Sequence, residues 1–115
     1  MVYLGFDVGG SSVKYALIDE TGKFLQKGNF STPGDLDLFY EGLKEVRESL
    51  PGSEEIAGAC FSLPGAVDEV SGVIGGSSAI DYIHGFDIRS ELEKVLQLPV
   101  SMENDANCAA LGEIW

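Results

Sequence analysis

Three strand-like segments at the start of the chain are joined by connections that allow only antiparallel pairing. Residues 2–8 form an apolar run, residues 12–18 alternate between two faces, and residues 23–30 have the polar content of an edge strand. Gly9-Gly10 separates the first two segments, and the turn sequence DETG separates the second from the third. Parallel neighbours need a crossover of about a dozen residues or more. We therefore expect an antiparallel three-stranded meander.

The remainder of the chain alternates helices and strands. Apolar residues with helical spacing predict an amphipathic helix that begins at Asp35 and ends before Pro51-Gly52. Residues 56–63 form a short apolar strand, and a glycine-rich loop over 64–86 contains a short strand pair at 66–67 and 73–74. A second helix, capped by Asp87, covers 87–97, a fifth strand covers 100–103, and a third helix starts at Asp105. The order β-β-β-α-β-α-β-α predicts an α/β domain with a mixed five-stranded sheet, covered by helices.

Composition excludes several classes of function. The 115 residues are 44% hydrophobic and 23% charged, as in globular proteins, and the net charge of −12 argues against nucleic-acid binding. We see no apolar run of membrane-spanning length and no signal peptide, so we expect no membrane partner and a cytoplasmic location. Cys60 and Cys108 lack metal spacing and are interpreted as two buried, reduced thiols rather than a disulfide or a reactive thiol.

The segment DVGGSS combines a carboxylate at the end of a buried strand with two glycines and two hydroxyls. Glycines let the backbone approach an anion, and consecutive N–H groups in such a turn form an anion-binding nest. Asp7 could hold Mg²⁺ directly or through water. The segment is neither G-x-G-x-x-G nor a P-loop, and an ordinary tight hairpin explains it equally well.

The segment ENDAN lies at the junction of the last strand and the expected third helix. Asp105 alone is explained by helix capping, which contributes about 1 kcal/mol. A cap does not explain Glu103, Asn104, Asp105 and Asn107 together beside an apolar strand, since clustered polar groups at a sheet edge need partners or a ligand. These residues therefore predict one wall of a binding cleft.

The segment FSLPGAVD follows the fourth strand and so reaches the same sheet edge. Pro64-Gly65 would bring backbone close to whatever occupies the cleft, although an ordinary turn is the simpler interpretation. The only histidine, His84, lies in the loop that follows, where a surface position is the more ordinary expectation than a catalytic one.

Taken in order, these segments resemble one family. DVGGSS resembles the phosphate motif D-x-G-G-T of the sugar kinase, heat-shock 70 and actin ATPase superfamily, which has a ribonuclease H-like fold. PVSMENDANCAALGE resembles the strand-to-helix element of ROK-family sugar kinases, and SLPGAVD followed by GVIGG resembles the segment between the two. The resemblance runs from Phe6 to Glu113, and the ENDAN element is its most specific part.

The resemblance implies a role for each matching position. Asp105 would be the catalytic base, Asn104 would bind sugar hydroxyls, and Gly65 and Ser78 would line the sugar site. The phosphates of ATP and the Mg²⁺ ion would lie at the first motif, which comprises Asp7, Gly9, Gly10 and Ser11. Phosphoryl transfer depends on positioning, charge neutralisation and one base, which agrees with this set of groups.

The resemblance also sets the expected domain organisation. Family members are about twice as long or more and carry a second, larger domain with the adenosine site, none of whose motifs occur here. We therefore expect residues 1–115 to be the N-terminal domain of a two-domain, homodimeric hexose kinase, inactive without its nucleotide-binding half. Ser11 replaces the usual threonine and keeps its hydroxyl. The loop GGSSAIDYIHGFD lacks the N-x-P-x-W sequence of many glucokinases and looks closer to the β-glucoside kinase branch.

Three alternatives compete with this interpretation. The first is the sugar-sensing domain of a ROK transcriptional repressor, which would carry a helix-turn-helix before the phosphate motif. An assembly ATPase of the actin type would not need the Asn104-Asp105 pair. A Rossmann dinucleotide domain is disfavoured by the missing G-x-G-x-x-G and by the three leading antiparallel strands.

Overall fold

The chain opens with three strands and then alternates strands and helices. A computed structural model describes residues 2–50 and 55–103. Within these residues the α-helices are α1 (Leu36–Ser49) and α2 (Ile88–Leu96), and a 3₁₀ turn lies at Asp81–Ile83. The strands are β1 (Val2–Val8), β2 (Ser12–Asp19), β3 (Phe24–Ser31), β4 (Ile56–Ser62), β5 (Ala66–Asp68), β6 (Val73–Gly75) and β7 (Val100–Glu103).

A mixed five-stranded sheet organises the fold, in the order β3-β2-β1-β4-β7. β1 pairs antiparallel with β2, and β2 pairs antiparallel with β3. β4 pairs parallel with β1, and β7 pairs parallel with β4. The predicted meander and mixed sheet are therefore confirmed, with the polar strand β3 at one edge. β5 and β6 form the separate two-stranded sheet that the sequence predicts.

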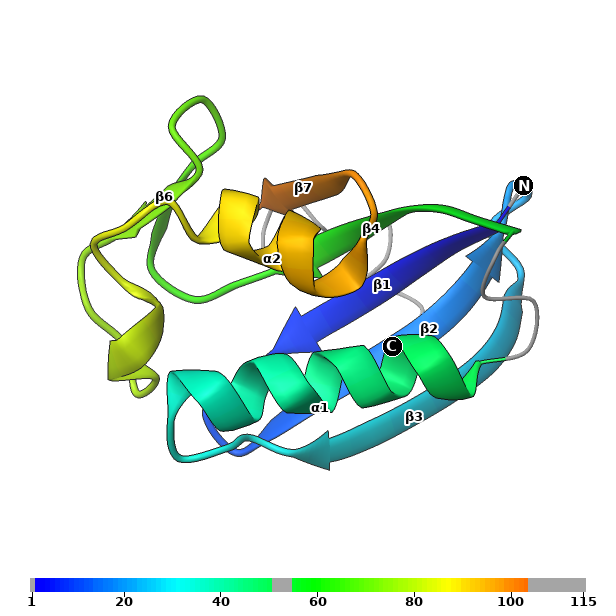
Figure 1. The fold of residues 1–115 in the computed structure, drawn as a ribbon, viewed down its shortest axis with the longest axis horizontal. Coiled ribbons are helices and arrows are strands. Elements are labelled where there is room, and N and C mark those ends of the chain that lie inside the picture. Colours follow the sequence, from blue (N-terminus) through cyan, green and yellow to red (C-terminus); the bar gives the residue numbers. More distant parts are fainter. Residues whose placement is uncertain (1, 51–54, 104–115) are drawn as a thin grey trace.

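Both helices lie across the same face of the sheet, as Figure 1 shows. The Asp35 carboxylate caps α1 by accepting the Leu38 N–H at 2.9 Å. The predicted cap of α2 is confirmed, since the Asp87 carboxylate accepts the Ser90 N–H at 3.2 Å. Each cap satisfies a backbone donor that the first turn of a helix leaves without an intrahelical partner.

The hydrophobic core lies between this face and the helices. Alternate residues of β1 and β4 face the helices, and the rings of Phe6 and Phe61 stack there with their centroids 4.7 Å apart. Phe39 and Leu43 of α1 and Leu92 of α2 are fully buried against them. Burial of each such side chain contributes about 1.5–3 kcal/mol to the stability of the fold. The core therefore stabilises the sheet that positions the loops at its edge.

Part of the sequence-based prediction lies outside the described residues. The expected helix from Asp105 belongs to residues 104–115, as do Asn107 and Cys108. The first helix ends at Ser49, before Pro51-Gly52, as the sequence predicts.

Candidate functional site

The glycine turn after β1 encloses a small polar pocket. Its volume is about 280 Å³, and its lining residues are those of the first sequence motif together with two residues of β2: Asp7, Gly9, Gly10, Ser11, Ser12 and Lys14. The Gly9 N–H donates to the Ser12 carbonyl at 3.0 Å, which closes the turn. A Cβ at Gly9 would lie only 3.2 Å from that carbonyl oxygen. The structure therefore brings together all four residues of the predicted phosphate and Mg²⁺ element.

Thr32, just beyond β3, holds this turn from the outside. Its hydroxyl donates to the Gly9 carbonyl at 2.6 Å, and its N–H donates to the Ser11 carbonyl at 3.1 Å. The sequence analysis missed Thr32, because its connection to the turn depends on the register of β3 against β2. Both bonds are made to carbonyl groups of the turn, so Thr32 occupies none of its N–H groups.

Polar residues form a row across the sheet near the carboxyl ends of the parallel strands. Asp7 lies opposite Lys14 on β2 and opposite Ser62 on β4, and Ser62 lies opposite Glu103 of β7. Phe6 is buried under the helices, so Asp7 lies on the face turned away from them. A carboxylate beside a glycine turn suits Mg²⁺, which is usually held by one or two carboxylates with phosphate and water oxygens. No group of three or more potential metal ligands occurs among the described residues.

Gly65 lies in the loop between β4 and β5 with a backbone angle φ of +99°. An added Cβ would lie 2.7 Å from Cε1 of His84, and 3.0 Å from both the Gly75 carbonyl oxygen and Cγ2 of Ile74. Real Cβ atoms essentially never approach another heavy atom as closely as 2.7 Å, and side chains rarely adopt this φ. Only glycine fits this position, because the added methyl group would meet His84, Gly75 and Ile74. The close approach of this backbone to a ligand stays a prediction.

His84 is half-buried and hydrogen-bonded at both ring nitrogens, so the surface position expected for it is wrong. Nε2 lies 2.8 Å from the Ser78 hydroxyl, and Nδ1 lies 3.3 Å from the Ile74 carbonyl oxygen. The ring also forms the wall against which Gly65 packs. Two of the predicted sugar-site residues, Gly65 and Ser78, are thus joined through a histidine that the sequence analysis did not include in the site.

The two halves of the candidate site meet at the glycine turn. A Cβ at Gly10 would lie 3.2 Å from Cβ of Ala79, the residue that follows Ser78. The phosphate-motif loop and the loop with Ser78 are therefore packed against each other. Asn104 and Asp105 lie outside the described residues; the chain runs into them from the end of β7.

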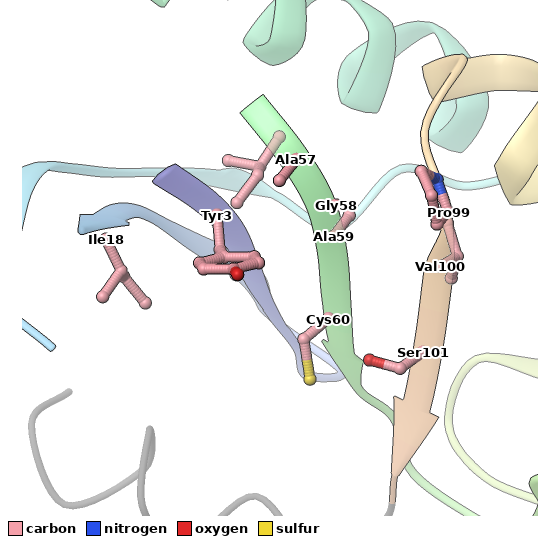
Figure 2. Close-up of a pocket in the computed structure, with 11 residues that line it drawn as sticks. Tyr3, Ile18, Ala57, Gly58, Ala59, Cys60, Pro99, Val100 and Ser101 are labelled. Atoms are coloured by element: carbon pink, nitrogen blue, oxygen red, sulfur yellow. The ribbon is translucent and has the colours of Figure 1, made fainter. Parts of the chain in front are cut away.

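A second cavity lies elsewhere on the sheet. A groove with a volume of about 450 Å³ lies toward the amino ends of the parallel strands, on the face turned away from the helices. Figure 2 shows the residues that line it. Its eleven lining residues include no charged side chain, and their polar groups are the hydroxyls of Tyr3 and Ser101 and the thiol of Cys60. Cys60 is a half-buried free thiol, so it is less buried than expected, and its reduced state stays a prediction. The groove lacks the charged groups that bind phosphates and offers few of the polar groups that bind sugars.

Within the described part of the chain, no helix is both long and apolar enough to cross a membrane.

Comparisons with known proteins connect this geometry to one family. The family model described as the ROK family matches residues 3–115. A β-glucoside kinase of Klebsiella pneumoniae is 35% identical over 116 residues, an alignment that covers 100% of this chain and 38% of the relative.

Two solved structures have the same fold. A ROK family protein of Streptococcus pneumoniae in complex with sucrose has a TM-score of 0.85 and 39% identity, over 99% of this chain and 38% of that one. A ROK family glucokinase of Streptomyces griseus, in complex with glucose and AMPPNP, has a TM-score of 0.81 and 27% identity, over 98% of this chain and 36% of that one. The chain thus spans less than two fifths of the length of these relatives.

Proposed function

The chain belongs to the ROK family, and we propose that it is the N-terminal domain of an ATP-dependent hexose kinase. The observation that carries this proposal is the meeting of two loops at one sheet edge. The polar glycine pocket offers a place for phosphates, and the loop with Gly65 and Ser78 packs against it through Gly10 and Ala79. Relatives named β-glucoside kinase and glucokinase support a sugar as the substrate.

In the proposed reaction, Asp105 accepts the proton of a sugar hydroxyl while its oxygen attacks the γ-phosphorus of ATP. The new O–P bond forms as the bond to the ADP oxygen breaks, and ADP leaves. Asn104, Gly65 and Ser78 position the sugar, and a base held near the attacking hydroxyl converts a bimolecular encounter into an oriented one.

The glycine turn holds the phosphates in this proposal. Gly10 and Ser11 offer backbone N–H groups to phosphate oxygens, as anion-binding turns do, while the Gly9 N–H closes the turn and Gly9 lets the phosphates approach the backbone. Asp7 would hold Mg²⁺, directly or through water, and the ion would neutralise charge on the phosphate oxygens. The fixed turn, closed by the Gly9–Ser12 bond and held by Thr32, is suited to binding without rearrangement.

The adenosine site belongs, in our proposal, to a second domain outside this chain. The isolated chain should therefore bind sugar weakly, bind ATP weakly and transfer no phosphate. Titration calorimetry of this chain with ATP and Mg²⁺ tests this part, because submicromolar ATP binding would contradict it. The homodimer expected for the whole kinase stays a prediction that sedimentation can test.

The decisive test compares two substitutions in the full-length protein with a panel of hexoses and β-glucosides. Asp105→Asn should lower kcat about 10²- to 10⁴-fold, the usual contribution of a general base. Asp37→Asn is the matched control, since Asp37 is exposed on the first turn of α1, and its rate should stay normal. A normal rate for Asp105→Asn would remove Asp105 from the mechanism. A wild type that binds hexose but phosphorylates none would favour the sugar-sensing alternative.

A further inference from the structure

His84 connects three segments that are separate in the sequence. Its ring contacts Gly65 before β5, the Ile74 carbonyl within β6, and the Ser78 hydroxyl beyond β6. It is the only histidine of the chain. One of the two polar contacts of the ring is made to a carbonyl oxygen, which can only accept, and this contact defines where the ring proton lies.

The Ile74 carbonyl oxygen can only accept a hydrogen bond, so Nδ1 of His84 must carry the hydrogen. In the neutral ring only one nitrogen is protonated, and Nε2 then presents a lone pair. The Ser78 hydroxyl, 2.8 Å away, therefore donates to Nε2. The Ile80 carbonyl is an alternative acceptor for that hydroxyl, but at 3.3 Å it is the weaker one.

This arrangement fixes what Ser78 can offer to a ligand. A serine hydroxyl has one hydrogen and two lone pairs. Its hydrogen is directed to His84, and one lone pair accepts the Ile80 N–H at 3.2 Å. One lone pair of Ser78 remains. Ser78 is thereby an acceptor, and a group that meets it must be a donor such as a sugar hydroxyl.

We propose that His84 is a positioning residue of the sugar site, which turns the Ser78 hydroxyl into an acceptor for a substrate hydroxyl and supports the backbone of Gly65. This inference rests on the proposed function for its substrate. The ring performs both tasks at once, since Cε1 packs against Gly65 while Nε2 binds Ser78. The site would then prefer sugars with a free hydroxyl at the position that faces Ser78. Analogues with a hydrogen or a methoxy group at that position would bind more weakly, because they have no hydrogen to donate to Ser78.

Two substitutions of His84 in the full-length kinase distinguish the hydrogen bond at Nδ1 from the one at Nε2. Asn has an amide nitrogen close to the place of Nδ1 and can retain the bond to Ile74, but it is too short to reach Ser78. The side-chain amide of Gln reaches the place of Nε2, where its oxygen can accept the hydrogen bond from the Ser78 hydroxyl, but Gln loses the bond to the Ile74 carbonyl. Loss of one neutral hydrogen bond corresponds to about a 2- to 10-fold change in affinity.

We therefore expect His84→Asn and Ser78→Ala each to raise the sugar KM about 2- to 10-fold, and His84→Gln to raise it less than His84→Asn does, because Gln keeps the bond from Ser78. The KM for ATP should not change. The double variant His84→Asn/Ser78→Ala should be no worse than His84→Asn alone, because His84→Asn has already removed the contact with Ser78. Three results would overturn the proposal. The KM increases of the two single variants could multiply in the double variant, His84→Asn could leave the KM unchanged, or His84→Asn and His84→Gln could raise it equally. Thermal unfolding of each variant separates a folding defect from a binding defect.

A second measurement needs no catalysis. The ¹⁵N chemical shifts of the His84 ring in this chain should identify the neutral tautomer with hydrogen on Nδ1, and Ser78→Ala should shift the Nε2 resonance. A hydrogen on Nε2 would overturn the assigned direction of the Ser78 bond. If the whole wild-type protein phosphorylates no sugar, the proposed function fails and takes this role with it. If it is active and the His84 variants behave like wild type, only the role of His84 fails.

Discussion

Replacing Gly65 by alanine tests whether the loop before β5 is as tightly constrained as its geometry indicates. The substitution adds a single methyl group at a residue whose φ is +99°. That methyl carbon would lie 2.7 Å from Cε1 of His84 and 3.0 Å from the Gly75 carbonyl oxygen. Gly22→Ala is a matched control, because Gly22 has a φ of +87° and nothing within 4 Å of an added Cβ.

Three terms set the expected size of the effect. A left-handed backbone costs a non-glycine residue about 1–2 kcal/mol. Alanine restricts the unfolded chain, which offsets about 0.4–1 kcal/mol of that cost. Overpacking adds about 1–3 kcal/mol at Gly65 alone, because His84 is held by two hydrogen bonds and cannot move away freely. We expect Gly65→Ala to lower the free energy of unfolding by about 2–4 kcal/mol and Gly22→Ala by about 1 kcal/mol.

Urea unfolding of this chain, with linear extrapolation at a constant m-value, measures both losses. The difference between the two variants reports the packing at Gly65, since the backbone term is common to both. Losses that agree within about 0.5 kcal/mol, the usual error of such comparisons, would refute the close approach of His84 to Gly65. Gly65→Ala should also raise the sugar KM of the whole kinase, whereas Gly22→Ala should not.

Two further pairs of substitutions test other parts of the fold. The Tyr40 hydroxyl is buried with no hydrogen-bond partner among the described residues, and burial raises the pKa of Tyr40 to about 12. Tyr40→Phe should therefore be neutral or stabilise the chain by up to about 1 kcal/mol. Tyr82→Phe loses a hydrogen bond of 2.6 Å to the Pro33 carbonyl and should destabilise the chain by about 1 kcal/mol. Thermal unfolding measures both effects. Hydrogen bonds from Ser90 hold the pKa of Asp87 below its ordinary value of 3.8. The Asp87 carboxylate thus stabilises the fold above that value, and the stability is lost as the pH falls through the lower pKa of the folded state. Asp87→Ala should have a lower free energy of unfolding than wild type at pH 7, and the difference between the two should become smaller in acid. Asp87→Asn should keep the cap both at pH 7 and in acid.

Local patterns predicted most of the elements. Connections of a few residues determined the antiparallel meander, and Asp35 and Asp87 marked helix starts because capping is a short-range effect. The strand pair at β5 and β6 followed from glycines on either side of short apolar segments. In each case the deciding interaction joins residues that are near one another in the chain.

Local sequence patterns predicted less of the candidate site. The roles of Thr32 and His84 depend on where separate segments cross: Thr32 reaches Gly9 across 23 positions, and the His84 ring lies against Gly65 only because β5 and β6 pair. A histidine in a polar loop gives no local sign that both its nitrogens are bonded. The role of Asp105, together with those of the other site residues, stays a prediction.

The meander also has a consequence for the order in which the chain folds. The hydrogen bonds that shape the glycine turn, including those from Thr32, lie within the first 32 residues, and the β1–β2 and β2–β3 pairings around them join strands that are neighbours in the chain. The loop with Gly65 and Ser78 instead requires β4 to pair with β1 across the whole of α1. Closing long segments is entropically costlier and slower than closing short ones. We expect the phosphate-motif turn to mature first during synthesis and refolding, and the sugar loops to dock onto it afterwards.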